Sequence, residues 1–361
     1  MKILFVTDLY PVDKNEKTTP RTLANFVEGF EQEGVKVDVI KPNFILNSFV
    51  RQKPFYKTGK YEKVLNLNYW TPFLGKIENK FSLSKDLPDC IVAHMPSGSI
   101  FAHKLSKLFN RPIVCGVHIS DIEVLTKPLY KIYFKKALLS AFRHARLLAC
   151  RSFIIEKKLL ELYPEFKGKT FIAASGIDKD IIINRCEENF SSEKIKVLTC
   201  ANLKKRKNID KVILACKGLE SFELTVIGDG KERKNLERLS DNVKFLGHLP
   251  HKEVLQKMRE NDIFILPSIG ETFGMVYLEA MASGCITIGT KLDGIDGIIK
   301  NGKNGYLVNP VIDNIRSILL NIKNENVSTL KRLRCNSFNT IQCYTDSEMC
   351  EYYLQQISNI L

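Results

Sequence analysis

The amino-acid sequence predicts an α/β protein with two parallel sheets covered by helices. Apolar segments of strand length alternate with helical segments along most of the chain, and the connections have the length of βα units. The chain has 361 residues, of which 44% are hydrophobic. That is too long for one typical domain and long enough for two domains with separate cores.

The first series of strands and helices covers residues 3–173. Its strands are expected at short apolar runs, namely 3–7, 36–40, 89–94, 112–117, 145–150 and 169–173. Helices are expected at 22–33, which is amphipathic and is followed by Gly34, and at 99–109.

A second series covers residues 196–283. Its strands are expected at 196–200, 223–227, 243–246 and 262–266, and its helices at 210–217, 231–239, 252–260 and 275–283. The polar stretch 178–194, between the two series, is the best candidate for a linker.

The segment 271–284 carries the most informative chemistry of the chain. It follows a short apolar strand that ends at Pro267, and it passes from a loop into a helix closed by a glycine. The N–H groups of Phe273, Gly274 and Met275 are expected to point out of the helix N-terminus, where the macrodipole favours a phosphate. Gly274 has no side chain, so a ligand can approach the backbone closely.

Two glutamates stand on either side of this junction, with seven residues between them. Glu271 lies in the loop, beside whatever group is attached to the phosphate. Glu279 lies about one turn inside the helix, where its carboxylate can accept hydrogen bonds from a pair of ribose hydroxyls. The alternative is an ordinary amphipathic helix with two solvated glutamates, which would not require the glycine and proline positions.

The segment resembles the Glu-x7-Glu motif of retaining GT-B glycosyltransferases, in particular glycosyltransferase family 4. The flanking segments 227–230, 243–254 and 302–308 also resemble that family, and the resemblance is strongest over 197–310. It implies two Rossmann-like domains facing a central cleft. Residues 1–180 would bind the acceptor and residues 181–344 the nucleotide-sugar donor, and a final helix at about 345–361 would cross back to the first domain.

The resemblance places a diphosphate beside the cationic run that ends at Lys207, after a strand and before a helix. The family uses an arginine followed five residues later by a lysine. Lys207 matches the lysine, and Asn208 replaces a commoner glycine. Asn202 occupies the arginine position, so Arg206 or Lys205 would have to supply the missing charge. The alternative is a solvated basic loop.

Recognition of the nucleotide base is expected to use backbone groups. The turn that contains Gly228 and Gly230 and the loop through Leu249 occupy the corresponding positions of the family. Because backbone groups carry no side-chain identity, the sequence does not say which base is bound.

The first domain is expected to contribute polar residues at its strand ends. His118 and Asp121 resemble the family's His-Gly-x-Asp segment, with Ile119 in place of the glycine. His118 would bond a sugar hydroxyl or stabilise charge near the reacting carbon, and Asp121 would orient it or cap the next helix. His94, Arg21 and Asp121 are candidates on the acceptor side. A structural role is the alternative for both histidines.

The net charge of +14 is unevenly distributed. Residues 127–158 contain nine Lys and Arg but one acid, interleaved with large apolar residues. This pattern is typical of a basic amphipathic helix on an anionic membrane surface, and equally of a helix that covers a domain with its basic face in water. Nucleic acid is not expected as a partner, because no stacking platform or DNA-binding motif accompanies the charge.

The remaining features favour a soluble or peripheral cytoplasmic protein on the inner face of a membrane. The ten cysteines stand singly, as buried reduced thiols do, and no metal-ligand spacing is present. Neither a signal peptide nor a transmembrane segment is expected. No cofactor or metal is expected either, because the helix dipole and Lys207 would meet the charge of the diphosphate.

Taken together, the expected activity is retaining, metal-independent hexosyl transfer. A sugar would move from a nucleotide-diphosphate donor to a hydroxyl of a saccharide or lipid-linked saccharide, in the synthesis of surface polysaccharide or glycolipid. One alternative is a GT-B nucleotide-sugar hydrolase or epimerase, which would turn over the donor without an acceptor. The other is a non-catalytic basic protein that binds lipid or nucleic acid, which would need neither glutamate.

Overall fold

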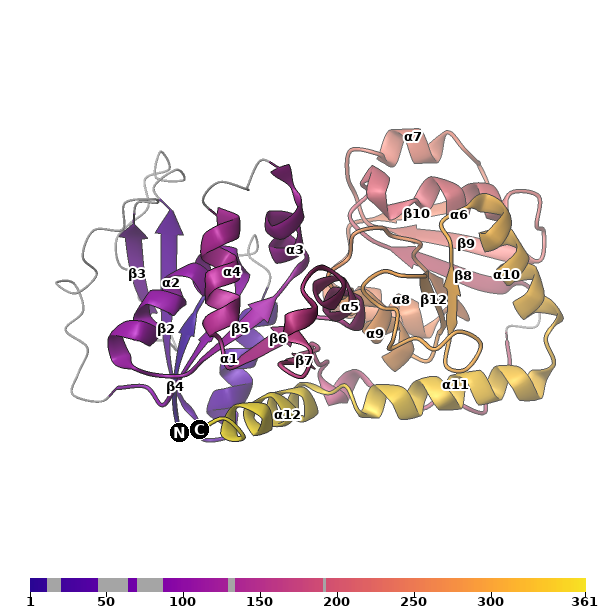
Figure 1. Cartoon of the computed structure of the whole chain (residues 1–361). Helices are drawn as coiled ribbons and strands as arrows, with labels where there is room; N and C mark the ends of the chain where they lie inside the picture. The colour runs from indigo at the N-terminus through magenta and orange to yellow at the C-terminus, as the bar shows by residue number, and fades with distance from the viewer. Residues whose placement is uncertain (12–20, 45–63, 70–86, 129–133, 191–192) are drawn as a thin grey trace. The chain divides into compact units, whose positions relative to one another are not determined.

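A computed structural model of the chain describes residues 1–11, 21–44, 64–69, 87–128, 134–190 and 193–361. They form two compact units (Figure 1). The N-terminal unit comprises Met1–Arg151, Ile155–Ala174 and Asp346–Leu361, and the C-terminal unit comprises Ser152–Ile154 and Ser175–Thr345. Each unit contains a parallel sheet with helices, so the predicted α/β class with two parallel sheets is confirmed.

The sheet of the N-terminal unit has the order β3-β2-β1-β4-β5-β6-β7. Its strands are β1 (Lys2–Val6), β2 (Lys36–Phe44), β3 (Val64–Tyr69), β4 (Cys90–Ala93), β5 (Ile113–Val117), β6 (Leu147–Cys150) and β7 (Thr170–Ile172). Phe5 of β1 pairs in parallel with Val39 of β2 on one side and with Val92 of β4 on the other. The strand order therefore reverses between β1 and β4, a position where open α/β sheets bind ligands.

Helices cover both faces of this sheet (Figure 1). They are α1 (Thr22–Gln32), α2 (Met95–Phe109), α3 (Ile119–Thr126), α4 (Phe134–His144), α5 (Phe153–Leu162) and the last helix, α12 (Asp346–Ser358). Helix α12 packs against α1, and its Tyr353 makes edge-on ring contacts with Phe26 and Phe30 of α1 and with Phe171 of β7. These contacts tie the end of the described chain into the core of the N-terminal unit.

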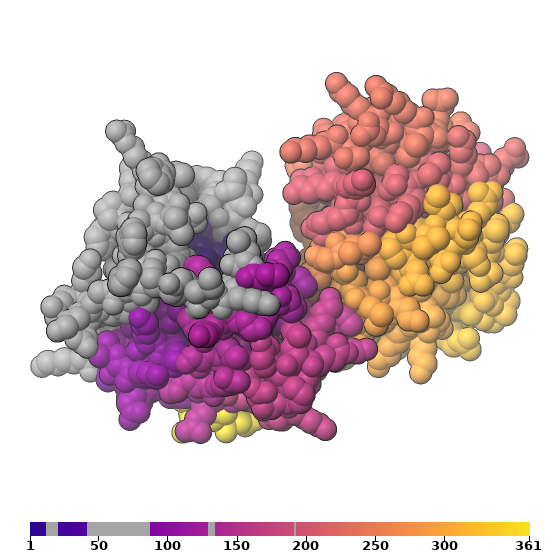
Figure 2. Space-filling view, turned by 45° about the horizontal axis from the view of Figure 1, so that its top comes forward, coloured from indigo at the N-terminus to yellow at the C-terminus, as the bar shows by residue number. Residues whose placement is uncertain are grey.

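The sheet of the C-terminal unit has the order β10-β9-β8-β11-β12-β13. Its strands are β8 (Ile195–Cys200), β9 (Phe222–Ile227), β10 (Lys244–Gly247), β11 (Ile263–Ile265), β12 (Ile286–Thr290) and β13 (Tyr306–Val308). Its helices are α6 (Ile209–Cys216), α7 (Arg233–Glu237), α8 (His251–Arg259), α9 (Met275–Ala282), α10 (Ile312–Asn324) and α11 (Val327–Gln342). The order reverses between β8 and β11, and Figure 2 shows the two halves as adjoining parts of the unit's surface.

The polar stretch 178–194 does not behave as a free linker. The N–H of Ile183 donates to the carbonyl of Ala282, and Arg185 donates to the carbonyl of Asn261. A Cβ built on Gly284 would lie 2.6 Å from the side chain of Arg185, so this arginine packs directly on the turn after α9. The described part of the stretch is therefore docked on the C-terminal unit.

The expectation of one basic amphipathic helix over 127–158 is wrong. The described residues of this stretch form the separate elements α4, β6 and the start of α5, and residues 129–133 lie outside the described part of the chain. Leu138 and Phe142 are fully buried in the core, and Arg151 is 2% exposed. The apolar side of α4 therefore covers its own sheet and is not available to a lipid surface.

Two further sequence expectations concern thiols and membrane spans. All ten cysteines are free, and six of them are buried. Within the described ranges, no helix has both the length and the apolar character needed to cross a bilayer.

Candidate active site

The loops after β8 and β11 meet at the position where the strand order of the C-terminal sheet reverses. The first loop contains the 3₁₀ turn Lys205–Lys207, and the second runs from Leu266 to Gly274, where α9 begins. Since β8 and β11 are parallel neighbours, their carboxyl ends place both loops on the same edge of the sheet. This edge is the candidate donor site.

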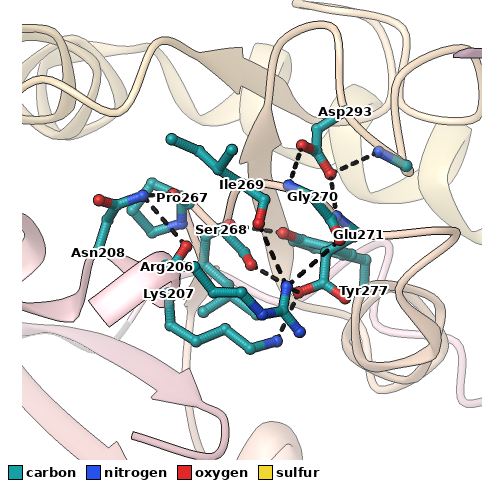
Figure 3. Close-up of polar contacts among 12 residues, drawn as sticks. Arg206, Lys207, Asn208, Pro267, Ser268, Ile269, Gly270, Glu271, Tyr277 and Asp293 are labelled. Carbon is teal, nitrogen blue, oxygen red and sulfur yellow. Dashed lines mark hydrogen bonds and ion pairs between the residues drawn. The ribbon is translucent and has the colours of Figure 1, made fainter. Parts of the chain in front are cut away.

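Glu271 is the centre of a polar cluster formed by these two loops. Its Oε1 accepts hydrogen bonds from Lys207 Nζ at 2.6 Å, from Arg206 Nη1 at 2.8 Å and from Ser268 Oγ at 2.6 Å (Figure 3). The side chains of Lys207 and Glu271 are only 12% and 15% exposed, whereas that of Arg206 is 47% exposed. Lys207 therefore forms the shielded ion pair, and Arg206 reaches the same oxygen from the solvent side.

The cluster keeps Glu271 ionised. Burial raises the pKa of this carboxyl, but the charge and hydrogen bond of Lys207, the Ser268 hydroxyl and the charge of Arg206 outweigh burial, so the net pKa is lowered. Two cations thus share one carboxylate oxygen of Glu271. Of the two cations expected to supply charge in place of an arginine at position 202, Arg206 lies in the cluster and Lys205 is exposed.

Backbone contacts fasten the two loops to each other. The N–H of Ile269 donates to the carbonyl of Arg206 at 2.9 Å, and Asn208 Nδ2 donates to the carbonyl of Pro267 at 2.8 Å. Asn208 has φ +52°, a left-handed conformation that asparagine tolerates better than most residues, which explains why it can replace a glycine here. Its side chain also supplies a bond to the second loop that glycine lacks.

Asp293, which the sequence analysis did not identify, positions the backbone of the Glu271 loop. Its two carboxylate oxygens accept the N–H groups of Gly270 at 2.7 Å and Glu271 at 2.8 Å, and the side chain is nearly buried (Figure 3). It lies 22 residues after Glu271, in the loop after β12, and no pattern in the sequence links the two residues. Only the parallel pairing of β11 with β12 brings the two loops together.

The N-terminus of α9 has the features expected of an anion site. Gly274 is its N-cap with φ +89°, and an added Cβ would lie 2.6 Å from the ring of Tyr277. The Tyr277 hydroxyl donates to the carbonyl of Leu266 at 2.7 Å, which fixes the helix start against β11. The N–H groups of Phe273, Gly274 and Met275 have no hydrogen-bond acceptor among the described residues. Unpaired N–H groups at a helix start favour negative charge.

Glu279 lies one turn further into α9 and has a partner that the sequence analysis missed. Its Oε1 is 2.9 Å from His251 Nε2 at the start of α8, and this hydrogen bond raises the pKa of His251. Leu249, just before His251, is half-buried. The residues expected to face the nucleoside thus include one more side chain, His251, which is 65% exposed.

The glycines of the 228–230 turn are required by the protein's own backbone. A Cβ on Gly228 would lie 1.9 Å from the carbonyl oxygen of Ala201, and one on Gly230 would lie 2.5 Å from that of Leu203. Gly228 also has φ +123°. Their absent side chains let the turn after β9 pack on the loop after β8, which supports the loop that carries Lys207.

In the N-terminal unit, His94 and His118 follow β4 and β5 and contact each other. His94 Nδ1 and His118 Nε2 are 3.0 Å apart, and the Tyr353 hydroxyl is 3.4 Å from His94 Nε2. His118 is 8% exposed and His94 is fully buried, stacked on Phe5. The ring of His94 offers no exposed surface in the N-terminal unit, and its assignment to the acceptor side stays a prediction.

Both imidazoles are neutral at ordinary pH. Burial and then the charge of Arg151 lower the pKa of His118 to about 3, and burial, His118 and Arg151 lower the pKa of His94 well below its usual value. Arg151 is fully buried, donates to the carbonyl of Ala173 at 2.6 Å and lies over the ring of Phe26. A neutral His118 can bond a hydroxyl but adds no positive charge to this strand end.

The other two residues expected on the acceptor side are engaged elsewhere. Asp121 is fully buried and accepts the N–H of His118 at 2.8 Å, which is the helix-capping role that was left open for it. Burial raises the pKa of Asp121 well above its usual value, and nearby Asp8 adds to this effect. Arg21 is at the start of α1, but its guanidinium pairs with Glu28 of the same helix at 2.7 Å.

Comparisons with known proteins agree with this geometry. Residues 180–337 match the family of glycosyl transferases group 1. The chain is 28% identical over 268 residues to an uncharacterized glycosyltransferase, MJ1178, of Methanocaldococcus jannaschii, an alignment that covers 70% of this chain and 72% of the archaeal protein.

Solved structures share the fold over the full chain. The apo form of the lipopolysaccharide outer core galactosyltransferase WaaB superposes with a TM-score of 0.76 at 18% identity, covering all of both chains. Anabaena Alr3699/HepE in complex with UDP superposes with a TM-score of 0.71 at 19% identity, covering 99% of this chain and all of the other. These similarities show that the chain shares the α/β fold of these glycosyltransferases and that its C-terminal part matches the model of glycosyl transferases group 1.

Proposed function

We propose that the chain is a retaining glycosyltransferase that moves a sugar from a nucleotide-diphosphate donor to a hydroxyl of a saccharide or lipid-linked saccharide. The observation that carries the proposal is the cluster of Glu271 with Lys207 and Arg206, at the carboxyl end of β11 and beside the unpaired N–H groups of α9. A saccharide or lipid-linked acceptor agrees with the description of WaaB, a structure of similar fold, as a lipopolysaccharide outer core galactosyltransferase. The HepE complex with UDP supports a nucleotide-sugar as donor.

In this proposal the diphosphate lies on the N-terminus of α9. Its negative charge is met by the helix dipole and by Lys207 and Arg206, which stabilise the leaving group as the glycosidic bond to phosphate breaks. The same groups would take the place of a divalent metal, and metal independence is part of the proposal. Glu279, held by His251, would accept hydrogen bonds from the ribose hydroxyls.

Glu271 would contact the sugar. Its pKa is lowered by its cationic partners, so it stays an acceptor of hydrogen bonds from sugar hydroxyls near the reacting carbon. Because its carboxylate is already shared by two cations, it is a weak nucleophile. This favours a front-face reaction assisted by the departing phosphate, with retention at the sugar carbon.

The acceptor would be bound by the N-terminal unit, where neutral His118 is the candidate for a hydroxyl contact. Association with an anionic membrane surface also remains part of the proposal. It would have to depend on exposed cations such as Lys157, because the apolar residues of α4 are buried.

The first test is thermal stabilisation of the full chain by UDP-, GDP-, ADP- and CDP-sugars in the presence of EDTA, since a ligand that binds the native state raises its stability. A shift with one nucleotide class, lost in Lys207→Ala and in Glu279→Ala, is the expected result. Lys205→Ala is the matched control, because Lys205 is exposed in the same turn and does not contact Glu271.

Product analysis separates transfer from the rival reactions. A transferase forms a glycosylated product when the acceptor is present, and it releases nucleoside diphosphate only slowly when the acceptor is absent. Rapid release of free sugar, or of an isomerised donor, in the absence of acceptor would replace transfer with hydrolysis or epimerisation. No stabilisation by any nucleotide-sugar would contradict the proposed donor site.

A further inference from the structure

A large cavity opens at the edge of the N-terminal sheet opposite to the strand ends that carry His94 and His118. Its volume is about 990 Å³. It is lined by residues at the amino ends of β5, β6 and β7 and by the last turns of α2 and α4. All of them belong to the N-terminal unit, so the cavity does not depend on how the two units are placed.

The lining is strongly basic. Lys107, Arg111, Arg143, Arg146 and Lys169 all line the cavity, and the acidic side chain among the described lining residues is Asp89. The Asp89 carboxylate already accepts the backbone N–H of Lys2 at 2.8 Å. Five cationic side chains thus converge on a space with little opposing charge from side chains.

Two of the five cations have structural roles that account for their presence. Lys169 Nζ donates to the carbonyls of Phe142 and Arg143 at the end of α4, where a helix C-terminus favours positive charge. Arg143 pairs with Glu165 at 3.0 Å on the surface. These contacts would exist whether or not the cavity binds anything.

The other three cations lack such an explanation. Lys107, Arg111 and Arg146 have no ion pair with an acidic side chain in the described part of the chain. The Nε atom of Arg111 is buried and has no hydrogen-bond partner among the described residues, and a buried donor without a partner is destabilising. An occupant with acceptor oxygens would satisfy this donor and offset the repulsion among the cations.

The same cations affect a neighbouring histidine, His144. Burial first, and then the charges of Lys107, Lys169 and Arg146, lower the pKa of His144, whose ring also lines the cavity. Ser106 Oγ lies 3.0 Å from His144 Nε2, so a neutral imidazole and a hydroxyl stand beside the cations. Ile360 and Leu361 add an apolar wall.

We propose that this cavity is a second binding site, distinct from the donor site, for a ligand that carries a phosphate or diphosphate group. Arg111 and Arg146 would bind the phosphate oxygens, with Lys107 at the rim. Guanidinium groups match the geometry of phosphate, and the apolar wall would contact the organic part of the ligand. The volume exceeds that of the phosphate group alone and lies at the upper end of the range for small-molecule sites.

The phosphate could belong to a free metabolite or to a lipid headgroup, and the experiment distinguishes them. Binding of inorganic diphosphate and of glycerol phosphate to the full chain is measured by calorimetry in a Lys207→Ala background, which suppresses the donor site. Co-sedimentation is measured with phosphatidylcholine vesicles that contain or lack phosphatidylglycerol. Each measurement is repeated with Arg111→Gln/Arg146→Gln and with the control Lys136→Gln, an exposed cation on α4 outside the cavity.

The expected result is that at least one probe binds and that the double substitution weakens it about tenfold or more, whereas Lys136→Gln does not. Binding of the soluble probes identifies a free phosphorylated ligand, and binding confined to phosphatidylglycerol vesicles identifies a headgroup. Absence of binding by every probe, or equal loss in the control, would overturn the proposal. Lys107→Gln, at an exposed position, serves as a second variant if the double substitution lowers the melting temperature without ligand.

Discussion

Both units present polar side chains after strands at or next to the reversal of the sheet, but the two groups of side chains differ in electrostatics. In the C-terminal unit, Lys207, Arg206 and Glu271 are charged and hold one another in ion pairs. In the N-terminal unit, His94 and His118 are buried and neutral. The same topology therefore supports a charged site in one unit and a neutral site in the other.

Solvent access and partners account for this difference. Glu271 is buried enough for its pKa to rise, but two cations reverse the shift, so ionisation survives partial burial. His118 has no carboxylate to stabilise its charged form, and Arg151 opposes protonation further. In the proposed reaction, a charged edge suits the diphosphate, whereas a neutral imidazole suits an uncharged hydroxyl.

The largest expected effect comes from removing the charge of Glu271. In Glu271→Gln, transfer should fall on the order of 10²–10³-fold, the loss typical of one preorganised polar contact at a reacting centre. Affinity for the nucleoside diphosphate should persist or increase, because Lys207 and Arg206 lose a competing anion. Steady-state transfer and calorimetric binding of the nucleotide measure the two effects.

The control for this variant is Glu253→Gln, an exposed glutamate on α8. It should change neither transfer nor binding. If Glu271→Gln abolished nucleotide binding as well, the main role of Glu271 would be to hold its loop. The division of roles, in which the cations bind the phosphate and Glu271 accepts hydrogen bonds from the sugar, would then be wrong.

An intermediate effect concerns acid stability of the N-terminal unit. The pKa of His118 is about 3 in the folded unit and about 6.5 in an unfolded chain, so below pH 6.5 the unfolded state binds a proton that the folded state does not. The contribution of neutral His118 to the free energy of unfolding is therefore complete above pH 6.5, and it is lost as the pH falls. At pH 5.5 the loss amounts to about 1 kcal/mol for this group.

Native-state hydrogen exchange of β5 amides between pH 8 and pH 5 measures this loss. His118→Gln should reduce the slope of stability against pH, and His248→Gln, at an exposed position of the C-terminal unit, should leave it unchanged. A slope that is the same in wild type and in His118→Gln would show that folding does not lower the pKa of His118, and the contrast between the units would disappear.

The smallest effect is expected at His251. Its hydrogen bond to Glu279 raises the pKa of the imidazole, so the pair stabilises the C-terminal unit below the unfolded pKa, and the contribution is lost as pH rises through the folded pKa. Because the ring is 65% exposed, we expect at most about 1 kcal/mol. Melting temperatures of wild type and His251→Gln should differ at pH 5.5 and converge by pH 8; an equal difference at both would rule out an ion pair.

The sequence predicted the C-terminal unit more closely than the N-terminal one. Lys207 lies in the loop after β8, and Glu271 and the start of α9 follow β11. The patterns of both strands are clear, so local periodicity was enough to put these residues on one sheet edge. Asp293 and His251 were missed, because each meets its partner only through strand or helix packing. No spacing rule links them to the glutamates.

The N-terminal candidates show the limit of strand-end reasoning. His94 follows β4, as expected, but Phe5, Phe26 and Tyr353 surround it, and Tyr353 comes from the last helix. A strand-end position indicates the edge on which a side chain lies, but not whether later segments cover it. The prediction of a membrane-facing helix over 127–158 failed for the same reason, because the apolar residues of α4 pack in the core of the N-terminal unit.

The sequence by itself determined the α/β class, the two series of βα units and the pairing of a cationic loop with the Glu271 loop. These follow from periodicity, from glycine and proline positions and from the rule that parallel strands end on one edge. Only the tertiary structure decided which groups are buried, which carboxylate holds which cation and where the basic cavity opens. Burial and electrostatic pairing depend on contacts between segments far apart in the chain, and no local pattern records those contacts.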